Sequence, residues 1–130
     1  MAAKGFGMSK TVSASYTDTV AKVKDALKAE GFGVLCEIDV QATLNEKLGE
    51  EFYPYIIIGA CNPPLAHRAL QADPEIGLML PCNVIVYETA TGTKVSAIDP
   101  EALVGQSGNA ALINVAHEVT IRLKSIVESI

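Results

Sequence analysis

The sequence predicts an α+β fold in which a mainly antiparallel sheet is covered by a long C-terminal helix. Short segments with alternating apolar and polar residues recur along the chain, and glycine or proline separates them. Residues 109–129 instead repeat their apolar positions at helical spacing. With 130 residues, of which 49% are apolar and 19% charged, the chain is expected to form one domain, residues 1–130, with its own core.

The elements are expected in the order β-α-β-β-β-β-α, with short helices inserted between strands. A strand is predicted over about residues 9–15, where apolar and polar residues alternate weakly. An amphipathic helix follows over about residues 16–30. Ser15 can cap the start of this helix, because Asp18 stands three residues later, as in a capping box.

Residues 32–40 are predicted to form a strand with one buried and one solvated face, because their apolar residues alternate clearly. Cys36 falls on the apolar face and is therefore expected in the core. Glu37 and Asp39 fall on the other face. Two carboxylates on one strand face are typical of paired catalytic acids, but a solvated face is the simpler interpretation.

The middle of the chain contains two further short helices and an apolar strand. A helix is predicted over residues 42–48, and a strand over residues 53–61 is apolar enough to lie inside the sheet. Gly59 in this strand indicates a bulge or the close approach of another backbone. A helix is predicted over residues 63–72, because proline is tolerated in a first turn.

The last third of the chain is predicted to form a hairpin and the long helix. Strands over residues 83–88 and 93–99 flank a short turn, and a loop over residues 100–108 has room for one helical turn. The helix over residues 109–129 must cover a sheet face to bury its stripe, and such a helix often leaves a cavity against a curved sheet. The stripe consists of Leu112, Val115, Ala116, Val119, Leu123, Ile126, Val127 and Ile130.

The charge and the apolar runs exclude several classes of function. A net charge of -5 and few aromatic residues disfavour nucleic acid and anionic membranes as partners. No apolar run approaches the ~20 residues of a spanning helix, and the first residues lack the apolar core of a signal peptide. A cytoplasmic location with three reduced cysteines is therefore expected.

Three stretches of sequence are more specific than the pattern of elements. They are Gly31-Phe-Gly-Val-Leu-Cys-Glu-Ile-Asp-Val40, Tyr55-Ile-Ile-Ile-Gly-Ala-Cys-Asn-Pro63 and Glu75-Ile-Gly-Leu-Met-Leu-Pro-Cys-Asn-Val84. Over about residues 10–128, the chain closely resembles the bacterial and archaeal domain-of-unknown-function family 302. The resemblance implies a fold like that of the TATA-box-binding protein domain: strand, helix, four antiparallel strands, helix. It leaves the biochemical role open and does not imply DNA binding.

A repeated dipeptide is the strongest local candidate for a site. Cys61-Asn62 ends one predicted strand, and Cys82-Asn83 begins the next. If these strands are antiparallel neighbours, the two cysteines lie close together at one end of the sheet. His67 stands one turn into the helix that follows Cys61, so that it also comes into reach. The tentative ligand-binding set is therefore Cys61, Asn62, His67, Cys82 and Asn83.

Several functions are open to this cluster. Cys61 and Cys82 are suited to a thiol-dependent redox function or, with His67, to ligation of zinc, copper(I) or a haem iron; a thiolate beside His67 is also suited to nucleophilic catalysis. The simplest interpretation is that both cysteines are small buried core residues and that the asparagines satisfy turn backbone.

The sequence contains no recognisable enzyme signature. Whether the protein is an enzyme is therefore uncertain, and a non-enzymatic protein is the favoured interpretation. We therefore expect a non-enzymatic domain that holds a small, mostly apolar or soft ligand between the sheet and the C-terminal helix. The alternative is a thiol-dependent redox or metal- or haem-binding protein that uses Cys61 and Cys82. The sequence identifies no cofactor.

Apolar residues on the outer side of the C-terminal helix predict that the protein forms a homodimer. Ile113 and Ile121 lie roughly opposite the apolar stripe and one turn either side of His117, in a strip with few charges. A symmetric partner is one way to cover this strip. Alternatively, the loop over residues 100–108 of the same chain covers it.

Overall fold

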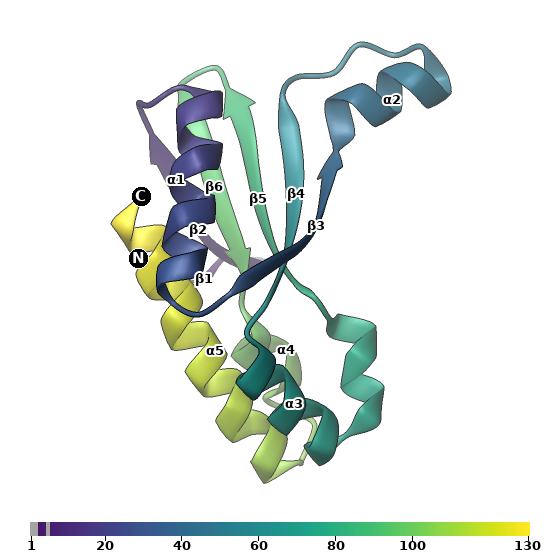
Figure 1. The fold of residues 1–130 in the computed structure, drawn as a ribbon, viewed down its shortest axis with the longest axis vertical. Coiled ribbons are helices and arrows are strands. Elements are labelled where there is room, and N and C mark those ends of the chain that lie inside the picture. Colours follow the sequence, from purple (N-terminus) through teal and green to yellow (C-terminus); the bar gives the residue numbers. More distant parts are fainter. Residues whose placement is uncertain (1–2, 5) are drawn as a thin grey trace.

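An antiparallel sheet with strand order β1-β2-β6-β5-β4-β3 forms the centre of the molecule (Figure 1). The computed structural model describes residues 3–4 and 6–130. Each neighbouring pair of strands is antiparallel. The strands are β1 (Ala3–Lys4), β2 (Gly7–Val12), β3 (Gly33–Asp39), β4 (Tyr55–Cys61), β5 (Cys82–Thr89) and β6 (Gly92–Ile98).

Helices connect the strands and close the chain, so the predicted α+β class and order of elements are confirmed. The helices are α1 (Tyr16–Ala29), α2 (Val40–Leu48), α3 (Pro63–Ala72), the 3-10 helix η1 (Pro74–Met79), α4 (Pro100–Val104) and α5 (Ala110–Ser129). Figure 1 shows α1 and α5 on the same side of the sheet, whereas α3, α4 and η1 gather at one end of it. At the opposite end, α2 projects from β3 and β4.

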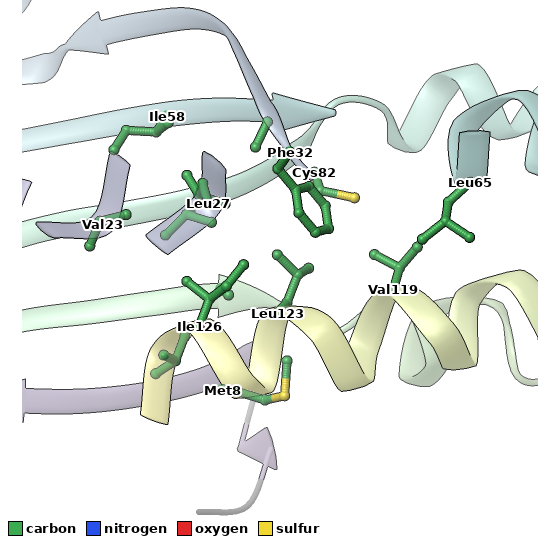
Figure 2. Close-up of a cluster of buried hydrophobic side chains, with 14 of the residues drawn as sticks. Met8, Val23, Leu27, Phe32, Ile58, Leu65, Cys82, Val119, Leu123 and Ile126 are labelled. Carbon is green, nitrogen blue, oxygen red and sulfur yellow. The ribbon is translucent and has the colours of Figure 1, made fainter. Parts of the chain in front are cut away.

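The core lies between the sheet and the two long helices. On β4, Ile56, Ile58 and Ala60 are buried, and their partners across the ladder on β5 are buried as well. Leu123 of α5 is completely buried in the same layer (Figure 2). Seven of the eight residues of the predicted helical stripe are buried, and Ile130 packs against the core from its edge, so the stripe is confirmed.

Side-chain caps explain why the long helices begin where they do. The hydroxyl of Ser15 accepts a hydrogen bond of 3.1 Å from the backbone N–H of Asp18, as the capping pattern predicts. Oδ1 of Asn109 accepts a hydrogen bond of 3.1 Å from the backbone N–H of Leu112 at the start of α5. Such caps satisfy N–H groups that have no partner inside the helix.

The prediction that β3 has one buried and one solvated face was wrong. β3 is an edge strand, and all seven of its residues are exposed. Its register against β4 shifts between Val34 and Cys36, which leaves Leu35 as the extra residue of a bulge. Because an extra residue reverses the alternation, Cys36 faces the side of the sheet that α1 and α5 do not cover. Cys36 is thus exposed rather than part of the core.

Other differences from the predicted elements are local. β2, which corresponds to the first predicted strand, ends at Val12, three residues before the cap of α1, and β1 precedes it as a strand that was not predicted. The loop after β6 contains the short helix α4, for which the prediction left room, whereas η1 occupies a segment for which no element was expected. Within the described residues, no helix is long and apolar enough to cross a membrane.

Candidate functional site

The ends of β4 and β5 bring the two predicted cysteines together. Ala60 pairs with Cys82 in the β4–β5 ladder, so Cys61 lies one residue beyond that pair. The expectation that these strands are antiparallel neighbours is therefore confirmed. The chain then turns at Asn62 into α3, which places a helix directly over this end of the sheet.

A cavity of about 50 Å³ lies at this end of the sheet, between β4, β5, α3 and α5. Figure 2 shows the side chains of Phe32, Leu65, Cys82 and Val119 around this part of the core. The cavity is lined almost entirely by apolar side chains, and Asn62 is the one residue with a charged or amide side chain among those that line it. The chemistry of the wall therefore favours apolar matter and disfavours ions.

Cys82 is buried in the wall of the cavity, whereas Cys61 is half-buried. Both cysteines are free thiols. Burial, and to a smaller degree the charge of Cys61, raise the pKa of the Cys82 thiol to about 11. Desolvation opposes the charged thiolate, so the sulfur of Cys82 is protonated at neutral pH and behaves as a soft, weakly polar group.

Asn62 is buried, and both ends of its amide are used by the fold. Its Oδ1 accepts a hydrogen bond of 3.3 Å from the backbone N–H of Leu65, which caps α3. Its Nδ2 donates a hydrogen bond of 3.4 Å to the carbonyl oxygen of Glu30 after α1. Because these bonds satisfy the amide, Asn62 joins two helix ends at the rim of the cavity.

His67 and Asn83 lie away from this cavity. His67 is exposed on α3, outside the set of side chains that line the wall. Asn83 pairs with Gly59 and is exposed on the uncovered face of the sheet, because successive residues of a strand face opposite sides. In residues 3–4 and 6–130, no three His, Cys, Asp or Glu side chains gather closely enough to hold a metal ion.

The strip around His117 on α5 is partly covered by α4 of the same chain. Nδ1 of His117 lies 2.9 Å from Oε2 of Glu101, and the backbone N–H of Glu101 donates a hydrogen bond of 3.0 Å to Oγ1 of Thr120. Ile113 is half-buried, and Ile121 is 54% exposed. The loop over residues 100–108 therefore covers part of this strip, as the alternative interpretation anticipated.

Much of the far wall of the cavity comes from two segments that were not expected to contribute to a site. Ile76 and Met79 of η1 line it, as do Leu103 and Val104 of α4. The apolar run Gly77-Leu-Met-Leu80 was the available signal, because such a run needs an apolar surface to pack against. Its position over α3 depends on tertiary contacts that no local pattern contains.

Comparison with known proteins identifies the family. The profile described as "Domain of unknown function DUF302" matches residues 8–130. The chain belongs to the DUF302 family. It is also similar to a solved structure described as an uncharacterized conserved protein DUF302 from Bacillus stearothermophilus, with 34% identity and a TM-score of 0.88. The alignment covers 96% of this chain and 98% of that one. A search of curated proteins found no match.

Membership of DUF302 agrees with the resemblance seen in the sequence and with the arrangement of elements. The family description assigns no activity, substrate or ligand. The cavity and the surfaces of this DUF302 chain are therefore the features that point to a function.

Proposed function

We propose that this DUF302 protein is a non-enzymatic domain that binds a small, apolar or soft ligand in the cavity between the sheet, α3 and α5. The observation that carries the proposal is the almost wholly apolar wall, to which the protonated thiol of Cys82 contributes a soft sulfur atom. An apolar cavity gives water few hydrogen-bond partners, so it tends to stay dry and to accept apolar guests.

The size of the cavity limits the ligand. A volume of about 50 Å³ accommodates a group of a few heavy atoms, far below the ~300 Å³ or more of a typical drug-sized site. A larger ligand would enter if η1 moved outward. None of the residues of η1 is buried, and Leu78 is exposed, so few contacts hold this segment down.

The alternative function uses the thiols of Cys61 and Cys82 in redox chemistry or in binding a metal or haem. A redox-active or nucleophilic cysteine needs thiolate character at neutral pH. Burial instead raises the pKa of Cys82 to about 11, which works against a thiolate. His67, the third member of that set, is exposed on α3. These features favour ligand binding over thiol chemistry.

The proposal includes a cellular setting and a partner. We place the protein in the cytoplasm, where its three free cysteines would stay reduced. Its partner in solution is a second copy of the same chain. Nucleic acid and membranes are not expected partners, because a net charge of -5 repels both.

Xenon is a suitable probe, because it is small, apolar and polarisable. We expect xenon pressure to shift the NMR signals of Leu65, Cys82 and Val119 in a saturable way. Ala66→Leu, which fills the cavity from α3, should abolish these shifts. Ala111→Leu is the matched control on the exposed face of α5 and should leave them unchanged. Unsaturable shifts, or equal shifts in Ala66→Leu, would contradict binding in this cavity.

A further inference from the structure

The outer edge of β3 is open in the described part of the chain. β3 ends the strand order and pairs with β4 alone, so one row of its backbone N–H and C=O groups faces outward. Natural sheets usually protect such an edge with lysine or other charges, proline, a β-bulge or a covering segment. β3 has a bulge at Leu35 and two acidic residues. The sequence of β3, Gly33-Val-Leu-Cys-Glu-Ile-Asp39, contains neither lysine nor proline.

Exposed apolar side chains concentrate around this edge. Eight of the eleven large apolar side chains that are exposed in the described residues lie on β3, α2, the loop after α2, α3 or η1. The first group is 38–67% exposed and comprises Val34, Leu35, Ile38, Leu48 and Tyr53. The second group comprises Leu70, Leu78 and Met79. Figure 1 shows α2 directly after β3, and the segment between α3 and β5 toward the opposite end of the sheet.

The charges of β3 do not oppose a second strand. Oε1 of Glu37 lies 2.6 Å from Nζ of Lys24, so this carboxylate is already paired within the chain. Oδ1 of Asp39 accepts a hydrogen bond of 2.9 Å from the backbone N–H of Ala42 and caps α2. An edge whose carboxylates are engaged in this way presents little repulsion to an identical edge.

Farther from the strand, the charges at the two ends of the edge are complementary. Residues 46–51, at the end of α2 and in the loop after it, carry three glutamates and one lysine. Residues 22–30, which lead from α1 toward the start of β3, carry three lysines, one of them Lys24 paired with Glu37, and two acidic residues, so their net charge is slightly positive. An antiparallel arrangement of two copies would bring each acidic end against a basic end of the other copy.

We propose that a second copy of this chain binds at this edge, so that the two β3 strands pair antiparallel and the two sheets become continuous. The inference rests on the self-association proposed above and assigns its interface. A two-fold axis perpendicular to the sheet relates the copies, as in isologous dimers. The α1–α5 layers of both copies then lie on the same side of the joined sheet.

The bulge at Leu35 determines where the axis lies. Opposed residues of an antiparallel pair must share a face, and the bulge reverses the alternation along β3. When the two-fold axis passes between Leu35 and Cys36, each pair of opposed residues on the two β3 strands lies on the same face of the joined sheet. Gly33 of one copy then opposes Ile38 of the other, and Val34 opposes Glu37.

This register also determines what α2 contacts. If the same pairing is extended beyond Gly33, then Val40, the first residue of α2, lies beside Gly31 of the other copy. The start of α2 then lies next to the end of α1 of the other copy. Val40, Leu44 and Leu48 follow each other at four-residue spacing on α2, so they form one apolar stripe on this helix.

Sedimentation equilibrium on the full chain tests the interface with two matched variants. Ile38 is 46% exposed at the β3 edge, and Ile121 is 54% exposed on α5. At micromolar concentration, the wild-type chain should have twice its mass of 13.7 kDa. Ile38→Glu should raise the dissociation constant by at least ~10-fold, because it introduces a carboxylate into the interface, whereas Ile121→Glu should not change it.

Each contrary result is informative. A wild-type mass of 13.7 kDa at every concentration would overturn both the dimer and its interface. A dimer that survives Ile38→Glu would overturn the interface alone. Dissociation by Ile121→Glu instead would move the interface to α5. None of these outcomes bears on xenon binding, so ligand binding is judged separately.

Cross-linking of the wild-type chain tests the axis without any destabilising variant. Cys36 lies beside the proposed axis, so a short bismaleimide should join the two copies through their Cys36 thiols. The covalent dimer should persist in Cys61→Ser and disappear in Cys36→Ser. Equal cross-linking in Cys36→Ser, or none in the wild-type chain, would overturn the register.

Discussion

The sulfur of Cys36 lies directly over the bare backbone of Gly59, across the β3–β4 pair. A methyl group added at Gly59 would lie 2.6 Å from Sγ of Cys36 and 2.8 Å from Cγ of Pro81. The two residues oppose each other immediately after the bulge in β3. Glycine is therefore required in β4 because side chains from two neighbouring segments occupy the space above it.

Gly59→Ala should destabilise the protein. The new methyl group must displace a thiol and a proline ring, and such overpacking costs typically about 1–3 kcal/mol. Cys36→Ala should recover part of this cost in the double variant, because it removes one of the two obstructions. Urea unfolding of the wild-type chain, the two single variants and the double variant measures the coupling free energy between the two positions. Additive effects of the two substitutions would contradict the contact.

Leu123→Ala should destabilise the protein much more than a truncation on the other side of the same helix. Leu123 is 0% exposed, and truncation of a buried leucine typically costs ~2–5 kcal/mol. Ile121→Ala is the control, since Ile121 is 54% exposed and should change the free energy of unfolding by under ~0.5 kcal/mol. Equal losses in chemical denaturation would mean that α5 does not dock through its Leu123 face.

The stability of the protein should decrease at alkaline pH because of Cys82. Burial, with a smaller contribution from Cys61, raises the pKa of this thiol from 9.0 to about 11. The folded state therefore holds the proton more tightly than the unfolded state. The resulting stabilisation is complete below pH 9 and is lost as the pH rises from 9 toward 11.

Cys82→Ala isolates this contribution from the other groups that titrate in the same range. Between these pH values, the wild-type chain should lose on the order of 2 kcal/mol more than Cys82→Ala in the free energy of unfolding. Cys36→Ala is the control and should retain the wild-type dependence, because its thiol is exposed. Parallel curves for the wild-type chain and Cys82→Ala would show that the thiol is not buried as described.

Alkylation of the native protein should distinguish ligand binding from thiol chemistry. Iodoacetamide should modify the exposed Cys36 in the native protein, whereas the buried Cys82 should react only after unfolding. Mass spectrometry of peptides after timed quenching measures each rate. Rapid modification of Cys82 at neutral pH would support the redox alternative and count against the binding function.

Much of the fold could be predicted, because local signals and tertiary structure agree. The helix over residues 63–72 has the predicted bounds, since a capping asparagine and two prolines determine its start. The stripe on α5 was also visible, because its period matches the face that packs on the sheet. The faces of β3 were not predictable, since the bulge at Leu35 depends on its pairing with β4.

The candidate site could be predicted only in part. Adjacency of Cys61 and Cys82 followed from strand order, but strand alternation places Asn83 on the opposite face from Cys82. On α3, the buried positions are Leu65 and Ala69, and His67 lies between them on the exposed side. The contributions of η1 and α4 to the cavity depend on contacts between distant segments, which no single motif specifies.

The central claim, that the cavity beside Cys82 accepts an apolar ligand, is tested most directly by a crystal structure under xenon pressure. The anomalous signal of xenon locates the atom without assumptions about the ligand. We predict a xenon site among Leu65, Cys82 and Val119 that is missing in Ala66→Leu crystals and retained in Ala111→Leu crystals. A wild-type crystal in which this cavity holds ordered water, or stays empty while xenon binds elsewhere, would contradict the claim.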